Sequence, residues 1–210
     1  MWALMFALLA IGACTVHYLA RPHLFTLVLL PVCVWIFEAD RRSPGKLIWL
    51  TIPLTIVWTN LHGGVLAWVA CAGIFLVGGT IELVLAGDSP RDWRPLRRHG
   101  VLVLATAAAT LVNPYGWDLH RHVAAYLRSD FIRTMIQEFQ SPSFRDENQL
   151  QYEVLLLAGL MAAAIALSRR RVVETMLIVF WAHQSLSSIR HITAFATLAA
   201  PIIAEEATRL

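Results

Sequence analysis

Apolar runs separated by short polar joints make up most of this chain, and the joints alternate between two kinds. The first kind is basic: Arg41 to Lys46, Arg91 to Arg98, and Arg169 to Arg171. The second kind carries histidine, asparagine, glycine and single arginines: Arg21 to His23, Asn60 to Gly64, Asn113 to Gly116, and Ser188 to His191. If every run crosses a bilayer, each kind of joint falls on its own face. The alternation therefore predicts a polytopic membrane protein whose unusual polar residues gather on one side.

Composition points the same way. The 210 residues are 58% hydrophobic and 15% charged, whereas soluble domains are about 45–50% apolar and about 25% charged. Lipid solvates the apolar surface that a soluble fold of this size could not bury. The net charge of +3 comes from residues in the joints, so we expect a lipid bilayer as partner and no nucleic acid. Because lysine and arginine mark cytoplasmic loops, the basic joints are predicted to face the cytoplasm.

Eight apolar segments can be drawn along the chain. They are Trp2–Ala20, Leu24–Phe37, Leu47–Leu61, Val65–Ala86, Val101–Val112, Val154–Ser168, Val172–His183 and Ile192–Ala204. A helical span needs about 20 residues, and several segments are shorter, so we predict six to eight spans. The apolar residues do not alternate with period two, which favours helices over strands. The expected fold is an all-α transmembrane bundle in which residues 1–210 form a single domain.

The longest polar region runs from Asn113 to Gln151 and predicts a helix lying on the membrane. Its apolar residues recur at helical spacing along one face: Leu119, Val123, Tyr126, Leu127 and Phe131. Charged residues lie largely on other faces, which is the pattern of an interfacial amphipathic helix.

The cysteines and histidines do not form a recognisable disulfide or zinc-binding motif. Cys14, Cys33 and Cys71 lie inside apolar runs, as small packing residues do. His120 and His122 are one residue apart, which points them away from each other on a helix, so no zinc site is predicted. No lysine or arginine precedes the first apolar run, so Met1–Ala20 is interpreted as a span rather than a signal peptide.

Arginine and histidine in the second kind of joint are the candidates for chemistry. Arg21 and Arg190 are flanked by apolar sequence, where arginine usually lines a cavity or pairs with an anion such as phosphate. The alternative is that these side chains reach out to lipid headgroups. The turn from Asn60 to Gly64 places His62 at the membrane surface, either for binding or as part of a capped helix hairpin. Glu138 is a candidate carboxylate at a cavity mouth, or a solvated loop acid.

Five motifs together resemble a known group. They are Arg21-Pro22-His23-Leu24-Phe25, Trp58 to Gly64, Asn113 to Gly116, Gln137 to Pro142, and Ser188 to Ile192. In this order they resemble bacterial polytopic membrane proteins related to the GT-C glycosyltransferases. The resemblance covers residues 21 to 204.

The resemblance implies a location, a substrate and roles for residues. GT-C enzymes transfer a sugar from a polyprenyl-phosphate carrier on the extracytoplasmic side of the bacterial inner (cytoplasmic) membrane. The implied contacts to the phosphate or donor are Arg21, His23, His62, Arg190 and His191. The residues implied to position the substrate are Asn60, Asn113, Tyr115 and Glu138. No metal ligand is implied, although the resemblance leaves a divalent metal cofactor open.

One departure from the pattern leaves the enzymatic assignment open. Such enzymes carry an acidic residue in the first external loop, and here no aspartate precedes Glu38. The chain is therefore expected to be the C-terminal part of a larger GT-C-like fold, or a shortened product without the base. The alternatives are a transporter, an assembly subunit that holds a lipid-linked intermediate, and a remnant without activity.

Overall fold

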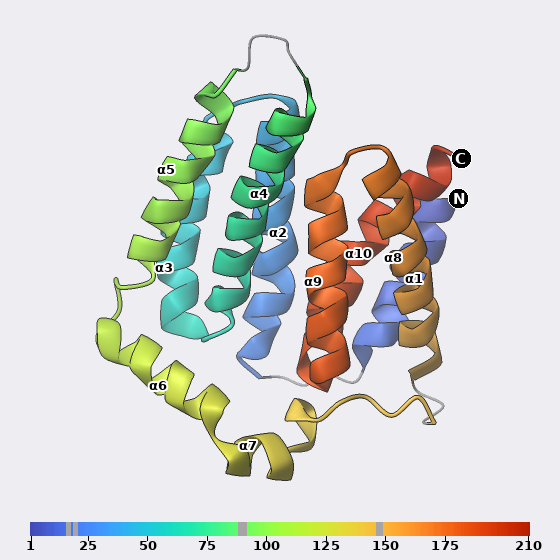
Figure 1. Ribbon diagram of the computed structural model, residues 1–210. Helices are drawn as coiled ribbons and strands as arrows, with labels where there is room; N and C mark the ends of the chain where they lie inside the picture. The colour runs from blue at the N-terminus through green and yellow to red at the C-terminus, as the bar shows by residue number, and fades with distance from the viewer. Residues whose placement is uncertain (16–17, 19–20, 88–91, 146–148) are drawn as a thin grey trace. The chain divides into compact units, whose positions relative to one another are not determined.

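The computed structural model describes residues 1–15, 18, 21–87, 92–145 and 149–210. Every regular element that these residues form is a helix, which confirms the all-α class (Figure 1). The chain divides into two compact units: unit 1 is Met1–Leu19 with Leu127–Leu210, and unit 2 is Ala20–Tyr126. The single domain predicted for residues 1–210 stays a prediction. Two residues used in the sequence argument, Ala20 and Arg91, lie outside the described residues.

Unit 2 is a helix bundle in which successive long helices run in opposite directions. Its elements are α2 (His23–Arg42), η2 (Leu47–Leu50), α3 (Thr51–Leu61), α4 (Val65–Leu85), α5 (Arg94–Ala109) and α6 (Trp117–Arg128), of which α6 ends two residues inside unit 1. Helix α2 packs on α3 and α4, and α5 packs on the same two helices (Figure 1). Because direction reverses at each connection, the start of α2, the α3–α4 turn and the α5–α6 turn share one end. The basic joints Arg41–Lys46 and the start of α5 share the other.

Unit 1 is built on close helix contacts through small residues. Its elements are α1 (Trp2–Cys14), α7 (Asp130–Met135), η3 (Gln137–Phe139), α8 (Leu150–Ser168), α9 (Val172–Ser187), η5 (Ile189–His191) and α10 (Ile192–Thr208). Helices α8, α9 and α10 pack against one another, and α1 packs on α8 and α10. A Cβ at Gly159 would lie 3.0 Å from the Phe195 ring, so glycine is what allows α8 to approach α10 this closely.

Within the described part of the chain, three helices are long and apolar enough to cross a membrane: α2, α4 and α8. Most side chains on both the exposed and the buried faces of these helices are apolar. On α8, for example, Leu157 and Met161 are exposed while Leu155 is fully buried. A helix that is apolar all round needs either a protein interior or lipid around it. These three helices therefore indicate a membrane protein, and the larger number of six to eight spans stays a prediction.

Asp40 holds together the basic end of unit 2. Its buried carboxylate accepts the N–H of Gly45 at 2.9 Å and the guanidinium of Arg98 at 2.8 Å. Nε2 of His99 lies 3.2 Å from the second carboxylate oxygen. Burial lowers the pKa of His99, and this outweighs the opposite effect of the Asp40 hydrogen bond and charge. The ring is therefore neutral at pH 7, and the contact is a hydrogen bond from Nε2–H to Asp40.

Arg171 holds together the basic end of unit 1. Its guanidinium donates to Glu174 at 3.0 Å, to Glu205 at 2.8 Å and to Glu206. Arg169 donates to Glu206 at 2.7 Å. The Glu206 side chain is only 1% exposed, so two guanidinium groups compensate a carboxylate that water does not reach. The cluster fastens the start of α9 to the end of α10.

The predicted interfacial helix is observed as two helices. Helix α6 ends at Arg128, and the side chain of Ser129 caps α7 by accepting the N–H of Ile132 at 3.4 Å. On α6, Leu119 and Val123 are half-buried against unit 2, whereas Trp117 is exposed. The chain breaks at Ser129 because a serine that binds the backbone competes with continuation of the helix.

Candidate functional site

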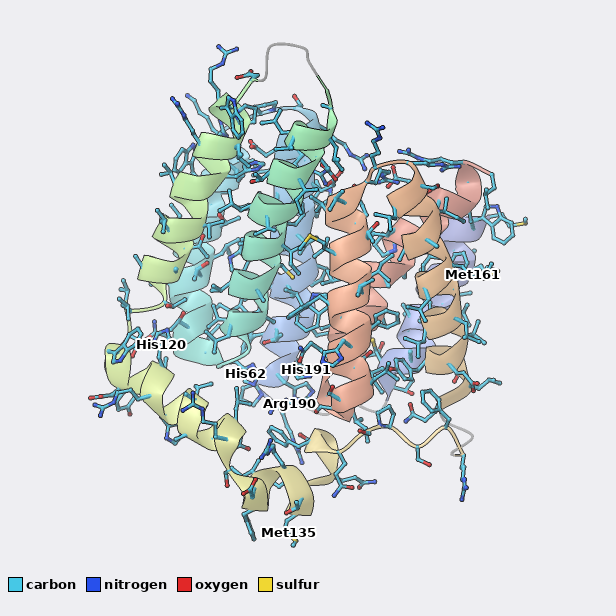
Figure 2. All side chains as sticks on the ribbon, in the orientation of Figure 1. His62, His120, Met135, Met161, Arg190 and His191 are labelled. Atoms are coloured by element: carbon cyan, nitrogen blue, oxygen red, sulfur yellow. The ribbon has the colours of Figure 1, made fainter. Side chains whose placement is uncertain are left out.

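Four of the predicted site residues, His62, Glu138, Arg190 and His191, lie in two clusters, each at the end of its unit opposite a basic joint. The His62 cluster, in unit 2, comprises Thr26, Trp58, His62 and Gly64. The Arg190 cluster, in unit 1, comprises Glu138, Phe139, Ser188, Arg190 and His191. Figure 2 labels His62 near the α3–α4 turn, and Arg190 and His191 near the end of α9. The prediction that both clusters contribute to one pocket stays a prediction.

Hydrogen bonds fix the ring of His62. Its Nδ1 lies 3.1 Å from the N–H of Gly64 and 2.8 Å from the hydroxyl of Thr26. A backbone N–H can only donate, so Nδ1 accepts. The indole N–H of Trp58 donates to the Thr26 oxygen at 3.1 Å, which leaves the Thr26 proton to point at His62. In the neutral ring the proton is therefore on Nε2, and His62 presents a hydrogen-bond donor in a defined direction.

Gly64 is required for this arrangement. A Cβ at Gly64 would lie 2.2 Å from Oγ1 of Thr26 and 2.7 Å from Nδ1 of His62. Both distances are far inside van der Waals contact, and Thr26 is too short and too stiff to move aside cheaply. A Cβ at the neighbouring Gly63 would meet only a methyl group of Val123, at 3.7 Å. The two glycines therefore form a matched pair, one essential to the cluster and one not.

The two asparagines of unit 2 use their amides on the main chain. The amide nitrogen of Asn60 donates to the carbonyls of Ile56 and Val112, both at 2.8 Å, and so ties α3 to the segment after α5. Asn113 donates to Thr110 and Gly116 and accepts the N–H of Tyr115 at 2.8 Å. These bonds shape the turns. The positioning role predicted for Asn60 and Asn113 therefore has to act through the turns or through the remaining Asn60 carbonyl oxygen.

Arg21, His23 and Tyr115 lie at the same end of unit 2. Arg21 precedes α2 and is exposed, and His23 is the half-buried first residue of that helix. Thr26 follows His23 by three residues, which places the two side chains on neighbouring positions of one helix face. Tyr115 is 72% exposed at the α5–α6 turn. Unit 2 thus brings Arg21, His62 and Asn113 to one end, as the alternation of joints predicts.

The Arg190 cluster is held by backbone and ring contacts. The Ser188 hydroxyl donates to the carbonyl of Glu138 at 2.8 Å, and the N–H of Ile189 donates to the carbonyl of Gln140 at 2.9 Å. These two bonds dock η3 against η5. The guanidinium of Arg190 lies over the Phe139 ring, 4.3 Å from its centroid. Stacking uses the face of the guanidinium, whereas an anionic oxygen binds at its edge, so both contacts are compatible.

His191 has the opposite tautomer to His62. Its Nδ1 lies 3.3 Å from the carbonyl of Gln184, and a carbonyl only accepts, so Nδ1 carries the proton. The ring also packs against Trp181, with 6.1 Å between ring centroids. In the neutral state Nε2 of His191 is then a proton acceptor. One cluster thus offers an imidazole donor, and the other offers an imidazole base beside an arginine.

Five members of the clusters were not among the predicted site residues: Thr26, Trp58, Gly64, Phe139 and Ser188. Each is recognised by its partner across the fold, and the sequence carries no local signal for such pairings. Among the described residues, no group of three histidine, cysteine, aspartate or glutamate side chains is placed to hold a metal ion.

Comparison with known proteins adds no relative. No family model, no curated protein and no solved structure matches the chain. The resemblance to GT-C proteins therefore depends on the five sequence motifs.

Proposed function

We propose that the chain is a polytopic protein of the bacterial cytoplasmic membrane, related to GT-C glycosyltransferases, that binds a polyprenyl-phosphate-linked sugar and transfers the sugar on the extracytoplasmic side. Three apolar helices support the membrane location. In unit 2, Arg41, Arg42, Lys46, Arg94 and Arg98 lie at the end opposite the His62 cluster, and in unit 1 the joint Arg169 to Arg171 lies at the end of α8 opposite the Arg190 cluster. Cytoplasmic basic ends, as the positive-inside rule requires, would put each cluster at the outer surface.

The observation that carries the proposal is the ring of His62, which hydrogen bonds hold in one orientation at the end of unit 2. Its Nδ1 takes two donors, 2.8 and 3.1 Å away, and so directs Nε2–H. A donor of this kind suits a phosphate oxygen whose charge grows during the reaction. Arg190, with its face held on Phe139, supplies the positive charge for the same phosphate chemistry.

Sugar transfer breaks the bond between the anomeric carbon and the phosphate oxygen, and forms a bond from that carbon to an acceptor hydroxyl. The phosphate leaves with the bonding electron pair, and the hydroxyl proton must go to a base. The contacts to the phosphate or donor are those that the resemblance implies, namely Arg21, His23, His62, Arg190 and His191, and Nε2 of His191 is the proposed acceptor of the proton. Asn60, Asn113, Tyr115 and Glu138 shape the surface on which the sugar and acceptor lie.

Holding a lipid-linked sugar without transferring it is the second candidate function. It is favoured by the amide groups of Asn60 and Asn113, which are engaged by the main chain rather than directed at a substrate. An assembly subunit or a transporter needs the phosphate contacts of the two clusters but no base.

The test uses the full chain in proteoliposomes with a labelled polyprenyl-phosphate-linked sugar, measuring both retention of the lipid and release of the label to an acceptor. We expect Arg190→Ala and Gly64→Ala to lower transfer by about 10²-fold, the usual effect of losing one preorganised contact to a leaving oxyanion. Gly63→Ala is the matched control and should keep the starting rate, because its Cβ meets only Val123, at 3.7 Å.

Each outcome decides between the two functions. Transfer that is lost in Arg190→Ala and Gly64→Ala but kept in Gly63→Ala supports the transferase. Retention of the lipid with no transfer supports the holding function. Equal transfer rates in all three variants and in the unchanged protein would show that neither cluster takes part in transfer.

A further inference from the structure

Four buried hydroxyl groups lie on α3 and near the end of α5, two helices that pack on each other in unit 2. Thr55 and Thr59 on α3 face the interior, as do Thr106 on α5 and its C-cap residue Thr110, and none is more than 6% exposed. The two helices run in the same direction, and the bond from Asn60 to the carbonyl of Val112 sets their relative height. That bond places these four side chains, which we call the threonine seam, within the same two helical turns.

Two hydroxyls of the seam differ from the rest. Thr55 donates to the carbonyl of Thr51 at 2.6 Å, and Thr110 donates to that of Ala107 at 2.6 Å, as helical threonines commonly do. The oxygens of Thr59 and Thr106 are buried and have no hydrogen-bond partner among the described residues. A buried polar group without a partner costs more than an ordinary hydrogen bond contributes, so both need an explanation.

His120 adds a third such atom at the end of the seam. Its Nε2 lies 2.9 Å from the Thr110 oxygen, whose proton is already donated to Ala107, so Nε2–H donates to Thr110. The remaining nitrogen, Nδ1, is then an acceptor, and it is buried without a partner among the described residues. Trp117 stacks on the ring, with 5.3 Å between centroids. Figure 2 shows His120 at the end of unit 2 where His62 also lies.

We infer that the threonine seam binds water, which enters unit 2 from the end that carries His120. Water both donates and accepts, so it satisfies two hydroxyls and an imidazole acceptor together, which a simple anion or cation does not. The seam residues are all uncharged, which fits a neutral ligand. One turn towards the basic end, Leu102 is fully buried and apolar, and it ends the polar stretch. In this inference water therefore reaches the seam from the end that carries His120.

Cysteine labelling in the bilayer tests the inference directly. In a variant without Cys14, Cys33 and Cys71, single cysteines replace Thr106, Leu102 or Leu104, and a small cationic thiosulfonate is added. Thiols react as thiolates, and these need water. Thr106→Cys should react about tenfold or more faster than both controls. Leu104 is the stricter control, because its side chain is 73% exposed on the outer side of α5 but would face lipid rather than water.

A melting measurement gives a second, independent readout. If water bonds to Thr106, the isosteric change Thr106→Val removes a satisfied hydroxyl and should lower Tm by about 2–4 °C. Thr55→Val, which removes a hydroxyl with known partners, shows the size of such a loss. Labelling of Thr106→Cys no faster than of Leu102→Cys, or a Tm that rises in Thr106→Val, would overturn the inference, because a dry unpaired hydroxyl is better replaced by a methyl group.

Discussion

Replacing Arg171 with methionine is expected to lower the free energy of unfolding by about 3–5 kcal/mol, the cost of removing one partner from a buried ion pair. Arg171 donates to Glu174, Glu205 and Glu206, and the last of these is 1% exposed. Burial alone would lower the pKa of Arg171, but Glu205 and Glu174 more than offset it, so the pKa lies above the ordinary value. Methionine replaces the apolar stem of arginine and removes the guanidinium, so the loss is mainly that of its ion pairs. Denaturant titration in detergent micelles measures it.

Two further variants show whether the loss comes from buried carboxylates. Arg209→Met removes an ion pair to Glu205 from a side chain that is 47% exposed, and should cost well under about 1 kcal/mol. Adding Glu206→Gln to Arg171→Met should restore part of the stability, because in Arg171→Met the buried charge of Glu206 keeps Arg169 but has lost its second guanidinium. A loss below about 1 kcal/mol in Arg171→Met would mean that water screens this cluster.

Replacing Asp40 with alanine is expected to cost about 3 kcal/mol in the same titration, since it leaves Arg98 and His99 without their shared acceptor. Asp40 also accepts the N–H of Gly45, so the joint between α2 and η2 loses its anchor. Asp40→Asn keeps an acceptor oxygen and should cost less. Asp92→Asn is the control: Asp92 pairs with Arg94 on the surface, and its loss should not be measurable.

The free energy of unfolding is expected to change with pH in a direction that can be checked. The pKa of His99 is lowered in the folded state, chiefly by burial, so the unfolded chain binds the proton more readily. Stability from this group is therefore present above the ordinary histidine pKa of about 6.5 and falls as pH drops below it. Asp40→Ala removes the contact that opposes this shift and should steepen the fall. A profile unchanged by Asp40→Ala would contradict the contact between Asp40 and His99.

The apolar runs and the polar joints between them predicted most helix positions, because lipid-facing and buried residues are both apolar in such a chain. Val65–Ala86 was observed as Val65–Leu85, and the joint at Ser188 as a turn. The helices extend beyond the apolar segments where polar residues continue them. Helix α5 starts at Arg94 rather than Val101, and α10 runs on to Thr208 because Glu205 and Glu206 are paired with arginines.

The contacts within each site could not be predicted in the same way. His62 is a plain surface histidine until Thr26, 36 residues away, is placed against its Nδ1. Arg190 and Phe139 are paired by the docking of two short turns, which no local pattern records. The unpaired hydroxyl of Thr106 likewise depends on side-chain rotamers in the packed core. What the sequence did predict was the end of the unit at which each residue lies.

Sidedness within each unit is the central claim, and cysteine accessibility in bacterial spheroplasts tests it most directly. The probe is a membrane-impermeant maleimide applied to single-cysteine variants that lack Cys14, Cys33 and Cys71. The outer-end variants are Tyr115→Cys and Gln140→Cys, and the basic-end variants are Lys46→Cys and Ser168→Cys. We expect the outer-end pair to be labelled in intact spheroplasts and the basic-end pair to be labelled only after lysis. Labelling of Lys46→Cys in intact spheroplasts, or of both ends of either unit from the same side, would contradict the account.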